Sequence, residues 1–302
     1  MYPTPNKSYR GRFAPSPTGP LHFGSLIAAV GSFLDARSRG GEWLVRIEDL
    51  DPPREISGAT DDILRTLDAL GLYWDGEVIY QSQRHHAYQQ ALEQLEGARL
   101  VYPCGCSRKD IQQNAVRSGS GSVYPGTCRN GLPQGRAARS LRLRVPDLDI
   151  RFSDRLQGDI AEWLPDKSGD FVIRRADGLF AYQLAVVVDD AGQGITDVVR
   201  GADLLDSTCG QIFLLQSLGY APPRYLHLPV AVNESGEKLS KQTNAPAVSR
   251  QQGINSLTAA LRFLGQRVPE GLEDSQLADF WDWAVQNWES ERIPDSRTIA
   301  DD

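Results

Sequence analysis

The sequence predicts an α/β fold built on an open parallel sheet, with an inserted α+β subdomain and a short C-terminal helical cap. The first observation is a short strand ending near Phe13, which leads through a proline-rich loop into an apolar helix. The second is a pair of apolar segments, residues 42–47 and 195–201, which have the composition of buried strands and precede helical patterns. The third is a run of alternating segments between residues 140 and 178, which is typical of antiparallel strands inserted between two halves. It includes a strand at 140–145, and we expect the strand that contains Phe152 to lie beside it.

The stretch RFAPSPTGPLHFGS, residues 12–25, joins the first strand to the first helix. Pro15 and Pro17 fix the backbone and exclude a helix before Thr18, so we expect the helix to begin near His22. A helix start has free backbone N–H groups and the positive end of the helix dipole, so it can bind phosphate. Taken alone, the stretch is equally compatible with an ordinary capped loop.

A second polar stretch, KLSKQ at residues 238–242, follows a strand expected at residues 225–232. Two lysines and a serine in such a loop can close over a triphosphate and neutralise charge at the transferring phosphorus. A lone loop of this kind is usually a solvated surface. The two stretches together, in this order and in one α/β body, are far more specific than either alone.

The pair resembles the HIGH and KMSKS signatures of class I aminoacyl-tRNA synthetases. The sequence PSPTGPLHFGS, followed by RIEDLD at residues 46–51, resembles the glutamyl branch of that family. The resemblance runs from about Tyr9 to Gln242, beyond which we expect no anticodon-binding domain. Ser25 departs from the family pattern, because it stands where the signature has a second histidine, but its hydroxyl can still donate a hydrogen bond.

The resemblance implies a Rossmann-like catalytic domain that joins ATP and L-glutamate into glutamyl-adenylate without tRNA, with Mg²⁺ accompanying the ATP. Closeness to the glutamyl branch and the missing domain together imply transfer of glutamate to the queuosine base in the anticodon loop of tRNA(Asp). Composition and spacing do not themselves indicate this acceptor.

The resemblance also implies residue roles. His22 and Lys241 would be catalytic, and Glu48 would contact the amino group of glutamate. Arg200 ends a predicted central strand, so it points into the cleft, where its fork suits a carboxylate. Together with Arg12 it would select glutamate over glutamine, because an amide would leave buried charge unpaired. The expected glutamate contacts are Arg12, Phe13, Ala14, Pro15, Ser16, Glu48, Tyr182 and Arg200, and the expected ATP contacts are His22, Gly24, Lys238, Ser240 and Lys241.

Three of the four cysteines, Cys104, Cys106 and Cys128, lie close together in the sequence. In a cytosolic chain this pattern suggests a metal rather than a disulfide, and thiolates favour one structural zinc ion with four ligands. The residues leave the fourth position open, and the resemblance places Tyr124 there, with water as the alternative. Three reduced thiols without a metal remain another interpretation. Cys209 lies in an apolar helix, where we expect a small core residue.

Composition indicates a globular chain, since 40% of its 302 residues are hydrophobic and 24% are charged. The net charge of −7 is uneven, because residues 269–302 carry ten acids and two arginines while residues 107–145 carry eight basic residues and only Asp110. A local basic face for RNA is therefore compatible with the acidic balance, although such a run can be only a solvated surface. No apolar stretch reaches the length of a membrane span, and the N-terminus is unlike a signal peptide. We expect a cytoplasmic monomer without membrane contact.

The expected division has four parts: the first half of the catalytic domain (1–102), the zinc-binding insertion (103–178), the second half (179–250) and the helical cap (251–302). The family favours a helix for the apolar run 181–190, which by periodicity alone could be a strand. Apolar spacing predicts helices at residues 58–70, 84–100, 109–116, 203–218, 256–264 and 274–288.

Three other functions remain open at this point. One is a truncated glutamyl-tRNA synthetase that acts on tRNA(Glu). Another is a non-catalytic, zinc-stabilised RNA-binding module, which would not require an intact lysine loop. The third is a generic nucleotidyltransferase, which would not need Arg12, Glu48 and Arg200 together.

Overall fold

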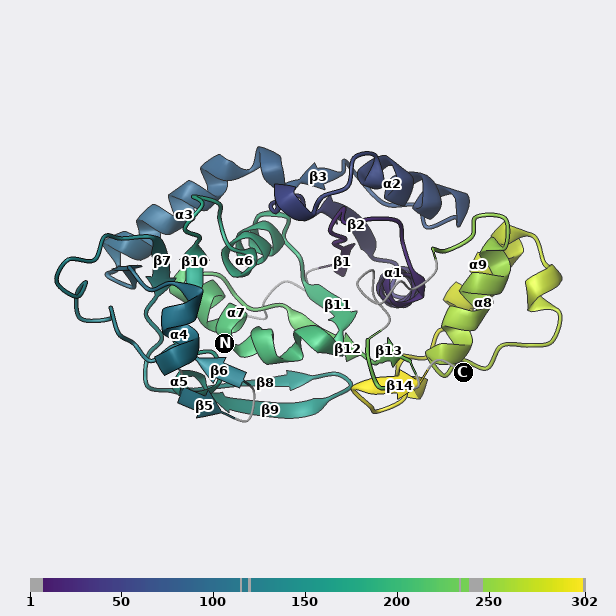
Figure 1. Cartoon of the computed structure of the whole chain (residues 1–302). Coiled ribbons are helices and arrows are strands. Elements are labelled where there is room, and N and C mark those ends of the chain that lie inside the picture. The colour runs from purple at the N-terminus through teal and green to yellow at the C-terminus, as the bar shows by residue number, and fades with distance from the viewer. Residues whose placement is uncertain (1–7, 115, 119–120, 234, 239–246, 301–302) are drawn as a thin grey trace.

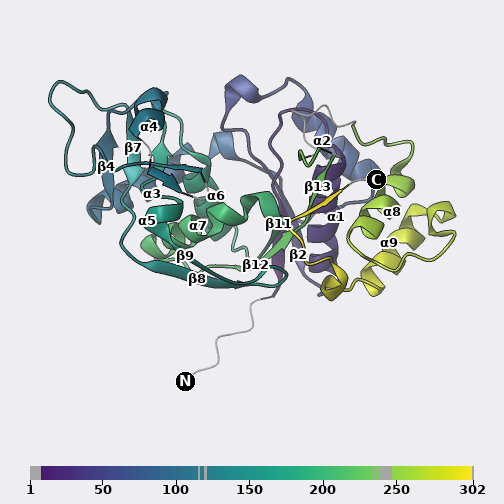
Figure 2. The same cartoon turned by 60° about the horizontal axis from the view of Figure 1, so that its bottom comes forward.

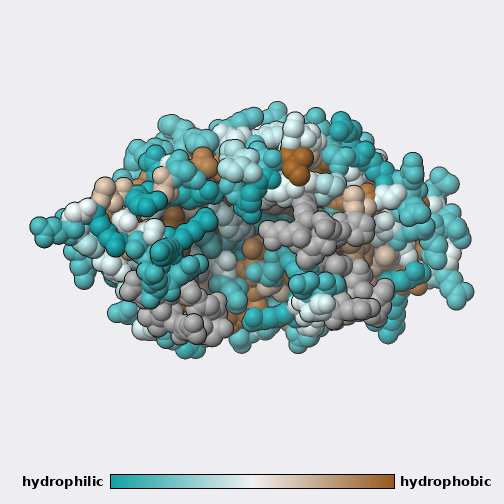
Figure 3. Space-filling model, in the orientation of Figure 1, coloured by the Kyte–Doolittle hydropathy of each residue, from teal (hydrophilic) through white to brown (hydrophobic). Residues whose placement is uncertain are grey.

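The computed structural model describes residues 8–114, 116–118, 121–233, 235–238 and 247–300. The molecule is elongated, with parallel strands at its centre, the cysteine-containing segment at one end and the C-terminal helices at the other (Figures 1 and 2). The face shown in Figure 3 is mostly hydrophilic, and its apolar residues form small separate groups. Among the described residues, no helix has the combination of length and apolar character that crossing a membrane requires.

Two sets of strands meet at the centre of the molecule. In the first set the three strands are parallel in the order β1-β2-β3, and in the second the order is β11-β12-β8-β9. The sets are adjacent, because the Thr196 N–H donates to the Arg10 carbonyl at 2.9 Å. The bounds are β1 (Arg10–Phe13), β2 (Glu42–Ile47), β3 (Ile79–Tyr80), β8 (Asp149–Asp154), β9 (Gly158–Trp163), β11 (Asp197–Gly201) and β12 (Arg224–Leu228).

The helices of the catalytic body form close to where the apolar spacing predicts them. The apolar run after residue 181 is helical, and it is buried on nearly all sides, which explains why its sequence shows no clear face. The helix predicted at 203–218 begins with a short 3₁₀ turn, η3 (Ala202–Leu204). The bounds are α1 (Phe23–Arg37), α2 (Ala59–Ala69), α3 (His85–Gly97), α6 (Tyr182–Gly192) and α7 (Leu205–Ser217).

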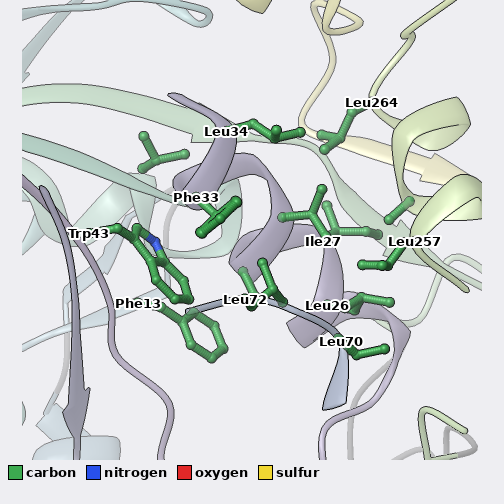
Figure 4. Packing of buried hydrophobic residues seen from close by; sticks show 14 of the residues in the cluster. Phe13, Leu26, Ile27, Phe33, Leu34, Trp43, Leu70, Leu72, Leu257 and Leu264 are labelled. Atoms are coloured by element: carbon green, nitrogen blue, oxygen red, sulfur yellow. The ribbon is translucent and has the colours of Figure 1, made fainter. Parts of the chain in front are cut away.

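The largest core surrounds α1, and Figure 4 shows its side chains pointing towards residues of the first strands and of a C-terminal helix. Leu26 and Leu34 are fully buried, which contributes roughly 2 kcal/mol each. Phe33 contacts Trp43 edge to face, with 5.2 Å between ring centroids. Gly31 allows Leu228 to pack closely against α1, because a Cβ at position 31 would lie 2.6 Å from the Leu228 Cδ1 atom. The core therefore fixes the helix whose first turn borders the site.

The segment after residue 100 contains more strand than the sequence predicts. The helix expected at 109–116 ends at Asn114, and Val116–Ser118 pairs antiparallel with Gly121–Val123, where the sequence predicts no strands. Valine favours strands by propensity, and the pair begins at Val116 and ends at Val123, which explains this correction. The bounds are β4 (Val101–Cys104), α4 (Arg108–Asn114), β5 (Val116–Ser118), β6 (Gly121–Val123), β7 (Ser140–Leu143), α5 (Leu164–Lys167) and β10 (Val172–Arg174).

The strand containing Phe152 is also not where we expected it. The sequence places it beside the strand at 140–145, but β8 instead pairs with the central strand β12, in parallel at Asp154 and Tyr225. The Phe152 ring packs on the Tyr225 ring at 5.5 Å between centroids, so an aromatic contact distant in sequence decides the pairing. The hairpin β8–β9 thus extends the catalytic sheet.

The C-terminal segment packs directly on the catalytic body. The strand expected at 225–232 is divided at Pro229, which has no N–H to donate to a ladder, so β12 is followed by a separate strand β13. A C-terminal strand, which the sequence does not predict, pairs with β13 in parallel. Leu257 and Leu264 join the core around α1. The bounds are β13 (Val230–Val232), α8 (Gly253–Phe263), α9 (Leu277–Gln286) and β14 (Thr298–Ala300).

Candidate active site

A cleft of about 720 Å³ opens where β1 and β11 end and α1 begins. Residues that are far apart in the sequence line it together, as expected for ligand sites at the carboxyl ends of parallel strands. Ser240 and Lys241 lie outside the described residues. The predicted site residues that line the cleft are Arg12, Phe13, Ala14, Pro15, Ser16, His22, Gly24, Glu48, Tyr182, Arg200 and Lys238.

His22 is the N-cap of α1. Its backbone is extended, and its Nδ1 atom accepts a hydrogen bond from the Ser25 N–H at 3.3 Å. In a neutral imidazole with an accepting Nδ1, the proton is on Nε2, which can then donate to a phosphate oxygen. His22 therefore combines two functions: it orders the first turn of the helix, and it adds a donor beside the backbone N–H groups.

Arg12 is held by a buried carboxylate. Its Nε and Nη2 atoms donate to the two Asp190 oxygens at 3.1 and 3.3 Å, and Arg46 binds the same carboxylate at 2.8 Å. Burial raises the pKa of Asp190, but the charges of Arg12 and Arg46 outweigh it and keep this pKa below its usual value. Asp190 thus offsets the charge of Arg12 while fixing one edge of its guanidinium.

Glu48 lies beside the same network, and Arg46 is 3.4 Å from its Oε1 atom. Burial raises the pKa of Glu48 above its usual value, and the charges of Arg46 and Arg12 offset this increase only in part. Arg46 is completely buried and links Glu48 to the helix α6 carboxylates. A carboxylate in this position can receive an ammonium group, whose charge would replace the lost solvation.

Arg200 is held by neutral partners. Its Nε donates to His227 Nε2 at 3.0 Å, and its Nη2 donates to Thr208 Oγ1 at 2.8 Å. His227 Nδ1 is 2.6 Å from Asp154 Oδ2. Burial lowers the pKa of His227 to about 4, the Asp154 hydrogen bond opposes this, and the Arg200 charge adds to it. The imidazole is therefore neutral near pH 7.

His227 makes the protein less stable in acid. Its pKa is about 4 in the folded chain against 6.5 in the unfolded chain, so the unfolded chain binds the proton first as the pH falls. We expect the free energy of unfolding to decrease from pH 6.5 downwards, by up to about 3 kcal/mol once the pH is below about 4. Urea unfolding at pH 7, 5.5 and 4 measures this, with the His227→Gln variant as the comparison. Equal pH dependence in both proteins would contradict the expectation.

Lys238 and Tyr182 border the cleft from opposite parts of the chain. Lys238 Nζ is 2.5 Å from Asp203 Oδ2, so the start of the KLSKQ loop is tied to the turn that follows β11. Tyr182 is the first residue of α6, and it is 36% exposed, whereas most large aromatic side chains are buried. An exposed aromatic beside Glu48 and Arg200 is available to a ligand rather than to the core.

Sequence motifs did not point to the residues that hold these groups. Buried polar side chains have no periodic signature, and their partners come from distant elements. The adjacent acids after the apolar run of α6 were one available signal, because a carboxylate that ends a buried helix requires a partner. The residues missed are Arg46, Asp154, Asp190, Thr208 and His227.

The three clustered cysteines converge at the far end of the molecule from α8. Their Sγ atoms all lie within 4.8 Å of one another, and this is the cluster in the described residues that can hold a metal ion. Tyr124 Oη lies 3.4 Å from the Cys104 sulfur and 3.8 Å from the Cys106 sulfur. Burial raises the pKa of Cys104, but hydrogen bonding with Tyr124 and with neighbouring groups outweighs burial and lowers this pKa to about 7. The donor set therefore fits a thiolate metal site.

Two arginines lie against this cluster. Arg142 stacks over the Tyr124 ring at 3.7 Å from its centroid, and Arg136 Nη1 is 3.8 Å from the Cys106 sulfur. Three thiolates around a divalent ion carry a net negative charge, which these guanidiniums would offset. Cys209 lies apart in α7, fully buried, as expected for a core residue.

A family model of tRNA synthetases class I (E and Q), catalytic domain, matches residues 8–267. The chain therefore belongs to this family, which confirms the fold class and the resemblance seen in the two signature stretches. The glutamate-tRNA synthetase from Elizabethkingia anophelis has the same fold, with a TM-score of 0.80, 23% identity, and coverage of 96% of this chain and 67% of that chain.

Curated relatives narrow the comparison within the family. The protein from Dechloromonas aromatica is 62% identical over 291 residues, which are 96% of this chain and 97% of the relative. Those from Chromobacterium violaceum and Pseudomonas aeruginosa are 57% and 52% identical, with coverage of 96% and 98% of both chains. All three are named Glutamyl-Q tRNA(Asp) synthetase.

Proposed function

We propose that this chain is a cytoplasmic ligase that activates L-glutamate with ATP, without tRNA, and transfers it to the queuosine base of tRNA(Asp). The names of its relatives support the amino acid and the acceptor. The observation that carries the proposal is the convergence of Arg12, Glu48 and Arg200 with the first turn of α1 in one cleft. That arrangement offers two guanidiniums for a carboxylate, one carboxylate for an ammonium group and a helix start for phosphate.

The reaction needs no nucleophile from the protein. An α-carboxylate oxygen of glutamate attacks the α-phosphorus of ATP, the bond to the β-phosphate oxygen breaks, and pyrophosphate leaves. Arg12 and Arg200 hold the side-chain carboxylate, while Glu48 holds the ammonium group, so the α-carboxylate is aimed at the phosphorus. His22 donates to the phosphates. Mg²⁺ accompanies the ATP and offsets part of its charge.

The proposed second step joins glutamate to a hydroxyl of the cyclopentenediol of queuosine. The hydroxyl oxygen bonds to the glutamyl carbonyl carbon, the bond between that carbon and the phosphate oxygen breaks, and AMP and the hydroxyl proton leave. We assign residues 103–178 to an insertion between catalytic halves 1–102 and 179–250, with residues 251–302 as a cap. Its β8–β9 hairpin joins the catalytic sheet, and its cysteine-containing part contacts the tRNA. The basic run at 107–145 supports this assignment. We propose that the enzyme acts as a monomer.

We propose that the cysteine cluster holds one structural zinc ion through Cys104, Cys106, Cys128 and the Tyr124 oxygen. The distances among the three sulfurs and the tyrosine oxygen support a four-ligand set. Tyrosine is an unusual ligand, since its hydroxyl must lose a proton, and a bound cation would favour that loss.

Charging of purified tRNAs tests the acceptor. We expect radiolabelled glutamate to appear on tRNA(Asp) that carries queuosine, and neither on tRNA(Asp) from cells lacking queuosine nor on tRNA(Glu). A product on tRNA(Glu) alone would contradict the proposal and favour a truncated glutamyl-tRNA synthetase.

Lys241→Ala is expected to slow adenylate formation about a hundredfold, because this lysine would neutralise charge that develops as pyrophosphate leaves. Glutamate binding should remain nearly unchanged, since no glutamate contact is assigned to the KLSKQ loop. Single-turnover kinetics measures the rate, and calorimetry measures glutamate affinity. A parallel loss of glutamate affinity would contradict the assigned role.

A further inference from the structure

The partners of Arg12 and Arg200 differ in charge, although they engage the same edge of each guanidinium. In both arginines the Nε and Nη2 atoms donate to protein acceptors, which leaves the Nη1/Nη2 edge oriented for a bidentate carboxylate. Arg12 pairs with the Asp190 carboxylate, which it shares with Arg46, whereas the Arg200 partners His227 and Thr208 are neutral. Arg200 therefore brings the less compensated positive charge to the cleft.

The interaction between Arg200 and His227 depends on one tautomer of the imidazole. Arg200 Nε carries a hydrogen, so His227 Nε2 must be the unprotonated nitrogen, and the proton must lie on Nδ1. Asp154 fixes this arrangement, because its Oδ2 atom accepts from Nδ1 at 2.6 Å. The opposite tautomer would direct two N–H groups at each other in a fully buried site.

Asp154 is itself fixed by the backbone. Its Oδ1 atom accepts from the N–H groups of Leu156 and Gln157, at 3.0 and 2.9 Å, and from the N–H of His227 at 3.2 Å. The carboxylate has no remaining freedom to rotate without losing these bonds. A continuous chain of hydrogen bonds therefore connects the backbone of the β8–β9 turn, through Asp154 and His227, to Arg200 in the cleft.

We infer that Asp154 and His227 are positioning residues that set selection for glutamate over glutamine by holding Arg200 with a neutral acceptor. A charged acceptor would cancel the arginine and weaken its preference for a carboxylate over an amide. A donor in place of the acceptor would turn the guanidinium out of position. This inference rests on the proposed function, because it concerns how the same cleft selects its amino acid.

Three substitutions distinguish an effect of the His227 tautomer from an effect on folding. In Asp154→Asn the amide oxygen can keep the backbone bonds, while the amide N–H₂ faces His227 and forces its proton onto Nε2. In His227→Asn the short amide can still reach Asp154 but no longer reaches Arg200. In His227→Gln the longer side chain brings a carbonyl oxygen to the place of Nε2. Asp170→Asn, which removes a buried carboxylate elsewhere, serves as the matched control.

Glutamate-dependent ATP–pyrophosphate exchange measures the effect on the cleft. We expect Asp154→Asn and His227→Asn to raise the KM for glutamate at least tenfold and to reduce the preference for glutamate over glutamine. The KM for ATP should stay within about twofold, and His227→Gln and Asp170→Asn should stay near the unsubstituted protein. An unchanged KM for glutamate in Asp154→Asn would overturn the inference, whether or not His227→Asn folds.

Long-range ¹⁵N–¹H NMR of the histidine rings gives a readout that needs no activity. The chain has four histidines, and loss of one signal set in His227→Gln assigns the ring. We expect the proton of His227 on Nδ1 in the unsubstituted protein and on Nε2 in Asp154→Asn. A proton on Nε2 in the unsubstituted protein would overturn the inference. Absence of any exchange activity in a protein with the expected tautomer would instead overturn the proposed function.

Discussion

Replacing Arg200 with alanine is expected to raise the KM for glutamate about a hundredfold, while the KM for ATP changes by less than about threefold. Arg200 is 5% exposed and lines the cleft, so its loss would leave the side-chain carboxylate of glutamate without its least compensated cation. Removing one partner of a buried charge pair costs about 3 kcal/mol, which corresponds to that factor. ATP–pyrophosphate exchange, measured once with glutamate varied and once with ATP varied, gives the two KM values.

The matched control for this substitution is Arg151→Ala. Arg151 lies on β8, its side chain is 75% exposed, and its ion pair with Asp149 is long at 3.5 Å, so its removal should leave both constants unchanged. Equal increases in the KM values for glutamate and ATP in Arg200→Ala would argue against a specific contact with the amino acid.

Replacing Cys128 with serine is expected to abolish stable zinc binding and transfer to tRNA while preserving adenylate formation. The small core around Cys104, Tyr102 and Tyr124 contains few apolar residues, so a metal would supply much of the local stability. The cleft borders the core around α1, and none of these residues lines it. The loss should therefore be confined to the tRNA-contacting segment.

Elemental analysis and the two partial reactions measure this separation. The unsubstituted protein should contain about one zinc ion per chain, and Cys128→Ser far less. Cys209→Ser is the control, because Cys209 is equally buried but lies in α7 outside the cluster. Full zinc content and full transfer activity in Cys128→Ser would contradict the assignment of the cluster.

Local patterns predicted the elements that frame the cleft. Two prolines followed by apolar residues with helical spacing located the start of α1 at His22, and the two signature stretches located the family. Non-local pairing was less accessible: β8 joins β12 because Phe152 meets Tyr225, a contact between residues far apart in the chain. The antiparallel pair of β5 and β6 was missed because the glycine- and serine-rich composition of residues 118–122 is typical of a loop.

The groups that line the cleft were predicted better than the groups that hold them. Arg12 and Glu48 lie in the stretches that carry the resemblance, Arg200 ends a predicted central strand, and the structure brings all three into one cleft. Asp190 and His227 are buried partners whose function depends on which distant side chain they meet. Such pairs have no fixed spacing, so they become visible only once the chain is folded.

Exchange of radiolabelled pyrophosphate into ATP, with glutamate and without tRNA, tests the central claim most directly. The proposed contacts for the amino acid all line the cleft and come from this chain, so we predict exchange that requires glutamate and is not supported by glutamine. Absence of exchange until tRNA is added, or exchange with glutamine at a similar rate, would contradict the account.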